Sequence, residues 1–254
     1  MKSVHEEGKF QKNLQKLAAR RIALLILVSS LLFLAGQFLA SLATNELDAA
    51  SHLKKLEEVF LRFDMQNREF LLNDRTVSAV EKIISGDEPE AIDEFKNYFR
   101  QFDESCDVHN QVMITNEDGE VLFTSFSESQ LSSYLVNYNN AVCYNARNCG
   151  EGEVYRAVYY DRGDYADALF IKPIFQNGEV SGYITLFLSG SGWNFYLSES
   201  NFDGVITDLR QNVMYISKPG LADSSNKFYG TEHGSWMHGH ARYWVVSKEL
   251  PEWP

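Results

Sequence analysis

One apolar segment constrains the fold of this chain more than any other feature. Residues 22–42 are 21 consecutive amino acids without a single Asp, Glu, Lys or Arg. A helix of that length, at about 1.5 Å per residue, is about 30 Å long and matches the hydrocarbon core of a bilayer. Only a helix lets a lone segment satisfy all its backbone hydrogen bonds inside lipid. The sequence therefore predicts a transmembrane helix over residues 22–43.

The charges that flank this segment predict its orientation. The N-terminal tail, residues 1–21, has the basic residues Lys2, Lys9, Lys12, Lys16, Arg20 and Arg21 against the acidic Glu6 and Glu7. A basic flank marks the cytoplasmic end of a transmembrane helix, so the tail is expected in the cytoplasm and the body outside. Small residues at positions 41–43 also allow a cleaved signal peptide, although the apolar run exceeds the roughly 7–15 residues of such peptides. Both interpretations export the body.

The composition of the body excludes several classes of function. The chain has a formal net charge of −12, and a nucleic-acid partner is not expected because binding to phosphates needs a basic face. The sequence contains no GxSxG, HExxH, phosphate-binding Gly-rich loop or CxxC motif, so we expect neither a catalytic site nor a cofactor. Neighbouring carboxylates carry no information in a chain with 35 Asp and Glu residues.

Three cysteines lie in the exported part, and disulfides form in such an oxidising compartment. Cys143 and Cys149 enclose the short loop YNARN, which a disulfide can close. Cys106 is then left over as a buried apolar residue. Pairing of Cys106 with either of the other two stays open, because the sequence does not fix connectivity.

The helix is expected to continue beyond the membrane to about residue 72, within a helical stalk assigned to residues 44–84. No Gly or Pro occurs between residues 44 and 72, and apolar residues recur there at heptad spacing. These residues are Ala49, Leu53, Leu56, Phe60, Phe63 and Phe70. The stripe fits two interpretations, packing against the helix's own domain or a homodimer contact, and both can apply along one helix. Two further helices are expected at residues 76–85 and 90–102.

The period then changes to that of β-strands. Residues 111–125 are expected to form a hairpin of two strands around a turn at 116–119. Further strands are expected at 154–160, 166–175 and 180–188, with a turn at 176–179. A second hairpin, residues 204–217, repeats the first at a constant offset of 92 without a gap, and a strand at 241–250 follows. This repetition predicts two similar modules, residues 85–195 and 196–254.

The organisation resembles a double Cache region, the extracytoplasmic sensing part of many bacterial receptors. MITNEDGEVLFTS and VITDLRQNVMYIS are similar to the opening hairpins of its two PAS-like modules, and ARYWVVSKEL is similar to the late strand of the second. The resemblance covers residues 40–254 and implies an α+β fold in which two tandem modules with antiparallel sheets follow the long helix. Such regions lead through a second transmembrane helix to an output module, so the chain is expected to be truncated before that helix.

The resemblance also implies a function. We expect the sensing region of a signal-transduction receptor in the bacterial inner or cytoplasmic membrane, with a small-molecule ligand and a homodimer formed through the stalk. A two-component sensor kinase is the first expected output, and a diguanylate cyclase or a chemoreceptor signalling domain is an alternative. A membrane-anchored extracellular interaction domain without signalling output is the alternative from another class.

The ligand residues are implied by a motif of the amino-acid-binding members, an Arg closely followed by aromatic residues. The nearest match is YRAVYYD, and the candidate ligand-binding residues are Arg156, Tyr159, Tyr160, Asp161 and Tyr183. Arg156 can bind a carboxylate through two hydrogen bonds, and a tyrosine ring can cover a cation. The family's Trp is absent and Phe187 stands near the place of its closing Asp, which argues against an α-amino acid. Strand alternation puts Arg156 and Tyr159 on opposite faces, one of which is core.

A second candidate site consists of three histidines near the C-terminus. His238 and His240 share a face if they lie on one strand, and together with His233 they can bind zinc, with Glu232 as a fourth ligand. A polar edge next to a Gly-containing loop is the alternative. A role in pH sensing is also open, because histidine titrates near neutral pH.

Overall fold

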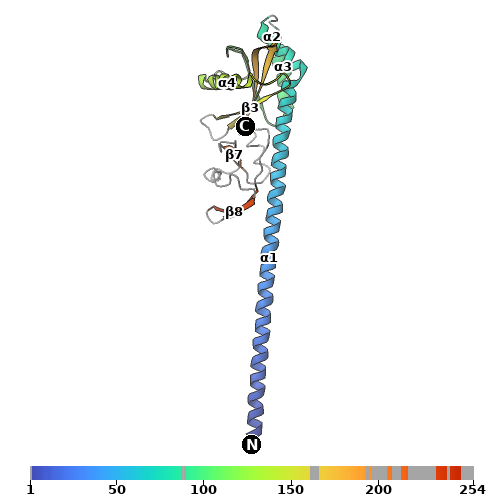
Figure 1. The fold of residues 1–254 in the computed structure, drawn as a ribbon, viewed down its shortest axis with the longest axis vertical. Helices are drawn as coiled ribbons and strands as arrows, with labels where there is room; N and C mark the ends of the chain where they lie inside the picture. Colours follow the sequence, from blue (N-terminus) through green and yellow to red (C-terminus); the bar gives the residue numbers. More distant parts are fainter. Residues whose placement is uncertain are drawn as a thin grey trace. The chain divides into compact units, whose positions relative to one another are not determined.

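The protein's fold is given by a computed structural model that consists of helices and antiparallel strands (Figure 1). The structure describes residues 2–86, 88, 90–160, 166–192, 195, 205–207, 213–216, 233–238 and 241–246. The chain divides into two units, one formed by residues 1–51 and 235–246 and the other by residues 52–234 and 247–254. The α+β class expected from the sequence is confirmed.

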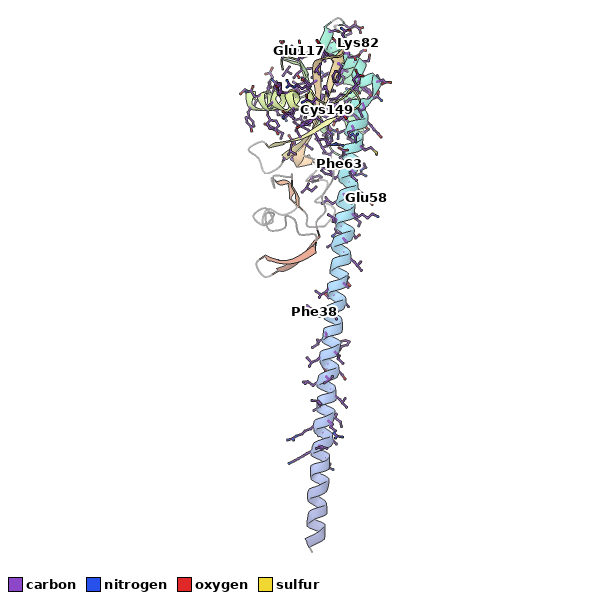
Figure 2. All side chains as sticks on the ribbon, in the orientation of Figure 1. Phe38, Glu58, Phe63, Lys82, Glu117 and Cys149 are labelled. Atoms are coloured by element: carbon purple, nitrogen blue, oxygen red, sulfur yellow. The ribbon has the colours of Figure 1, made fainter. Side chains whose placement is uncertain are left out.

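Helix α1 runs without a break from Lys2 to Leu72 (Figure 1). Within Gln15–Leu72 it contains a window that is long and apolar enough to cross a membrane, and none of that window is buried. Phe38 is one of many large apolar side chains on this part of α1 that are exposed (Figure 2). The predicted continuity from the apolar segment into a stalk is therefore confirmed, and the helix ends at Leu72.

The apolar stripe of α1 packs into the core of its own domain. Leu56, Phe60, Phe63 and Phe70 are all buried and belong to one cluster with the sheet. Ala49 and Leu53, earlier on the stripe, are only partly buried. Of the two interpretations of the heptad stripe, packing against the own domain therefore applies from Leu56 to Phe70.

Two shorter helices follow, as the sequence predicts. Helix α2, Asp74–Ser85, begins at Asn73, whose side chain accepts a hydrogen bond of 2.9 Å from the backbone N–H of Arg75. It ends at Gly86, which has a φ of 70° that glycine adopts without steric cost. Helix α3, Ala91–Glu104, buries Phe95 and Phe99 against the same core.

Five antiparallel strands form the sheet in the order β2-β1-β5-β4-β3. The strands are β1 Asn110–Asn116, β2 Val121–Thr124, β3 Tyr155–Tyr160, β4 Ala166–Gln176 and β5 Glu179–Leu188. The tight β4–β5 turn places Asn177 and Gly178 at φ values of 55° and 84°, which explains the Asn-Gly pair. All five strands are where the sequence predicts them, and β3 lies at an edge of the sheet.

Different helices cover the two faces of the sheet (Figure 1). Val112, Phe170 and Ile184 face the side that packs on α1, α2 and α3. Leu169 and Phe187 face the other side, which packs on helix α4, Ser133–Ala146. Helix α4 is not among the helices expected from the sequence, and it covers the candidate ligand-binding site.

Beyond the sheet the structure describes two hairpins. Strand β6, Val205–Thr207, pairs with β7, Val213–Ile216, and β8, His233–His238, pairs with β9, Ala241–Val246. Ile206 opposes Tyr215 as Ile114 opposes Phe123, and both hairpins have a register shift at the residue that follows the isoleucine. The repeat at an offset of 92 therefore extends from the sequence to the strand register.

Candidate ligand-binding site

Arg156 lies on the face of the sheet that packs on α1, where a carboxylate of the protein binds it. Its Nε and Nη2 donate hydrogen bonds to Oδ1 and Oδ2 of Asp64 at 2.6 and 2.9 Å. The two side chains are only 11% and 9% exposed. Arg68, one turn after Asp64, has Nη1 at 3.9 Å from Oδ2 of the same carboxylate. Arg156 thus makes the bidentate contact with a carboxylate that the sequence predicts for a ligand. The carboxylate, however, is that of Asp64 on α1.

Tyr159 and Tyr183 lie on the opposite face of the sheet, under α4, and both are buried. The ring of Tyr159 is 5.1 Å from that of Tyr138 and 6.0 Å from that of Tyr134, measured between centroids. Burial raises the pKa of the Tyr183 hydroxyl. The structure therefore brings two of the candidate ligand residues to the α4 face and puts Arg156 on the other.

The side chains of the other residues that the sequence suggests for ligand or metal binding are not described by the structure. The side chains of Tyr160 and Asp161 lie outside the described residues, and so do those of His233, His238 and His240. Strand β8 ends at His238, and His240 lies outside the described residues. The zinc site stays a prediction, and in the described part of the chain no cluster of His, Cys, Asp or Glu could hold a metal ion.

Polar side chains that the sequence analysis did not select are buried between α4 and the sheet. We call Thr115 of β1, Asn139 and Cys143 of α4, and Thr185 of β5 the polar cluster; all four are buried. The Cys143 Sγ lies 3.7 Å from the Thr185 hydroxyl. Among the described residues, the Thr115 hydroxyl and both polar atoms of the Asn139 carboxamide have no hydrogen-bond partner other than the nearby Cys143 thiol, which is a weak one. Burial of such an unpaired group costs about 1–3 kcal/mol, so it needs an explanation.

Helix α4 covers the polar cluster and is held at both sides. The Tyr138 hydroxyl donates a hydrogen bond to the Val158 carbonyl of edge strand β3. On the other side, Asn140 Nδ2 donates to the Gly119 carbonyl in the β1–β2 turn at 3.1 Å. Gly119 has a φ of 82°, and a Cβ there would lie 2.4 Å from Asn140 Nδ2, so this contact requires glycine.

The structure has the three cysteines as free thiols, with Cys143 directed from α4 toward Thr185 and Cys149 in the turn that follows α4. The disulfide between Cys143 and Cys149 stays a prediction. Burial raises the pKa of the Cys143 thiol to about 12, against the opposing effect of the nearby Thr185, Thr115 and Asn139 side chains. Burial also raises the pKa of Cys106, to about 11.

Alkylation by iodoacetamide at pH 8 is expected to modify Cys149 first and Cys143 last in the native chain. Only the thiolate reacts, and a thiol with a pKa of about 12 is ionised to about one part in 10,000 at that pH. Cys149 is partly exposed. Mass spectrometry of the peptides over time measures the order. A disulfide-linked peptide in the unreduced protein would contradict this prediction.

The fold is similar to those of solved sensor domains. The ligand-binding domain of the Campylobacter jejuni chemoreceptor Tlp3 in complex with L-valine matches with a TM-score of 0.53 and 14% identity, over 77% of this chain and 84% of that one. An extracellular ligand-binding receptor from Desulfohalobium retbaense matches with a TM-score of 0.50 and 12% identity, over 80% of this chain and 37% of that one. The chain has a Cache-type sensor fold.

This finding confirms the resemblance that the opening hairpin suggests. No protein-family model matches the sequence, and no curated protein matches it. Because identities of 12–14% relate the folds alone, the ligand residues of the Cache-type domain have to be inferred from its own geometry.

Proposed function

We propose that this chain is the extracytoplasmic sensing region of a bacterial membrane receptor for a small molecule. The observation that carries the proposal is the Cache-type sensor fold with unpaired polar groups of Asn139 and Thr115 buried beneath α4. The similar domain of the chemoreceptor Tlp3 binds L-valine, which supports a small polar ligand. A two-component sensor kinase is the first expected output, with a cyclase or a chemoreceptor signalling domain as alternatives.

The proposed arrangement in the membrane has residues 1–21 in the cytoplasm, residues 22–43 in the bilayer and the body outside. The exposed apolar surface of α1 and the basic tail support it. We further propose that residues 196–254 form a second module. The shared register of the β1–β2 and β6–β7 hairpins supports this duplication.

The ligand is proposed to bind between α4 and the sheet, in contact with Tyr159, Tyr183 and the polar cluster. In this placement Tyr159 of the YRAVYYD motif remains a ligand-binding residue. Arg156 of the same motif is instead the partner of Asp64 on α1. Edge strand β3 supports a route for the signal, because Tyr138 of α4 bonds its Val158 carbonyl and Arg156 bonds Asp64 of α1. A ligand that moves α4 would then change how the sheet holds α1.

A homodimer through α1 is part of the same proposal, on a different side of the helix than the heptad stripe. Leu61 and Met65 are exposed there, beside a hollow of about 550 Å³ that Asp64, Arg68 and Leu72 help to line. The mass of the full chain in detergent, measured by light scattering, tests this part, and a monomer at micromolar concentration would overturn it.

Thermal unfolding of the full chain in detergent tests the proposed function. The protein is mixed in turn with amino acids, amines, organic acids, nucleobases and divalent metals, and a ligand that binds the folded state raises the midpoint. We expect a hit whose shift is lost in Thr185→Val, at the polar cluster, and kept in Thr124→Val, on β2. A shift with zinc alone would move the site to the histidines. The absence of any shift would contradict a small-molecule sensor.

A further inference from the structure

We propose that the ligand beneath α4 is an uncharged molecule with an amide-type group, recognised by the Asn139 carboxamide. This inference rests on the proposed function and adds the chemical class of the ligand. An amide-type group, as in a carboxamide, a lactam or a nucleobase edge, presents a hydrogen-bond donor and an acceptor side by side.

The unpaired atoms beneath α4 define this chemistry. The Asn139 side chain presents an N–H₂ donor and a C=O acceptor next to each other, and neither has a strong hydrogen-bond partner among the described residues. The polar neighbour of Asn139 in the polar cluster is the Cys143 thiol, a weak partner. A ligand amide can pair with both atoms of the Asn139 carboxamide at once. The Thr115 hydroxyl can add a third hydrogen bond to the ligand, either as a donor or as an acceptor.

The strand register brings these groups together on one face. Thr115 of β1 opposes Tyr183 of β5, and Met113 opposes Thr185, so the two threonines lie on neighbouring strands and face α4 with the tyrosine. Phe187 follows Thr185 on the same face. The Asn139 carboxamide thus faces a surface of hydroxyl groups beside apolar and aromatic side chains, which suits a flat polar ring or amide.

The charges around this face favour an uncharged ligand. The buried side chains of β1, β4 and β5 that pack under α4 include Met113, Leu169, Ile171, Tyr183 and Phe187 beside the two threonines of the polar cluster, and none of these carries a charge at neutral pH. A carboxylate brought among them would lose its water without gaining an opposite charge, which costs far more than burial of an amide.

The charged side chains around this face either pair with other parts of the protein or are exposed. Arg156 bonds Asp64 on the other side of the sheet. Arg147, at the end of α4, is exposed and stacks on Tyr144 with 3.7 Å between Cζ and the ring centroid. Asp167, at the start of β4, accepts a hydrogen bond of 2.7 Å from the Gly190 backbone N–H. Arg147 and Glu117 act electrostatically on the Tyr183 hydroxyl, but both are exposed, so this cation and anion lie at the rim of the face and not beside the buried polar cluster, where an amino acid would need them.

Thermal unfolding of the full chain in detergent distinguishes the ligand classes. The uncharged probes are uracil, hypoxanthine and nicotinamide, and the charged probes are L-valine, L-glutamate, succinate and putrescine. We expect at least one uncharged probe to raise the midpoint, by about 5–10 °C at about one hundred times its Kd. Asn139→Leu is expected to abolish this shift, and it should raise the midpoint of the free protein because an unpaired buried amide is replaced by an apolar group.

Asn137→Leu is the matched control, because Asn137 is exposed on the same helix two residues earlier. This variant should keep the full ligand shift. A shift by an uncharged probe that survives Asn139→Leu would overturn the assignment of Asn139. Shifts by charged probes alone would overturn the ligand class and leave the proposed function intact. If no probe of either kind changed the midpoint, the proposed function would fail together with the inference.

Discussion

Asp64→Asn is expected to lower the free energy of unfolding by about 3–5 kcal/mol. The substitution removes the negative charge that two guanidinium nitrogens of Arg156 contact at 2.6 and 2.9 Å, in a place where both side chains are about nine-tenths buried. Because both side chains are about nine-tenths buried, little water can compensate the Arg156 guanidinium for the lost charge of Asp64. The midpoint of thermal unfolding of the full chain in detergent should fall by something on the order of 10 °C.

The geometry also predicts an asymmetry between the two partners. Arg156→Met should cost less than Asp64→Asn, because Arg68 stays 3.9 Å from the Asp64 carboxylate and can pair with it. The double variant Asp64→Leu/Arg156→Met should unfold close to the wild type, since an apolar pair often replaces a buried ion pair without loss of stability. A loss of stability in the double variant equal to the sum of the losses in Asp64→Leu and Arg156→Met alone would contradict a direct pair.

Asp107→Asn is the control for the same chemical change at the surface. Asp107 pairs with Arg62 at 3.0 Å, but the two side chains are 46% and 42% exposed. Exposed pairs contribute about 0–1 kcal/mol, so this variant should unfold within a few degrees of the wild type. Equal effects of Asp64→Asn and Asp107→Asn would mean that the Asp64–Arg156 pair is not buried in solution.

Most elements of this fold follow from local patterns in the sequence. The apolar stripe from Leu56 to Phe70, the change to strand periodicity and the Asn177-Gly178 turn each depend on neighbouring residues only, and each is found where expected. Helix α4 was missed because its sequence, SYLVNYNNAVCYNA, mixes Asn and Tyr into its apolar positions. Ser132 was the available signal, since its side chain caps the helix by accepting the Leu135 N–H at 3.1 Å.

The site was harder to predict because its contacts join distant parts of the chain. Strand alternation correctly separated Arg156 from Tyr159, but it could not decide which face carries the ligand. No local pattern relates Arg156 to Asp64, although an acidic residue beside the buried Phe63 of an apolar stripe hints at a buried partner. The polar cluster gave one signal, the position of Thr115 and Thr185 among apolar residues of the same strand face.

Phe95→Ala is expected to lower the free energy of unfolding by about 3–5 kcal/mol through a different cause, a cavity in the core. Phe95 of α3 has no exposed surface. Its ring stands edge-on to that of Phe123 of β2 at 5.6 Å and is stacked with that of Phe99 at 6.3 Å, measured between centroids. Helix α3 therefore packs on the β1–β2 hairpin through this side chain, and the loss should again appear in thermal unfolding of the full chain.

Ile92→Ala provides the comparison within the same helix. Ile92 lies one turn before Phe95 and is 39% exposed, so its truncation should cost less than about 1 kcal/mol. Phe95→Leu should fall between the two, because it keeps most of the buried volume while losing the edge-on contact with Phe123. If Phe95→Ala unfolded at the same temperature as Ile92→Ala, helix α3 would not be packed against β2 in solution. If only the Phe95 variants lowered the midpoint of unfolding, α3 would be shown to stabilise the β1–β2 hairpin. This is the hairpin whose strand register recurs in β6–β7.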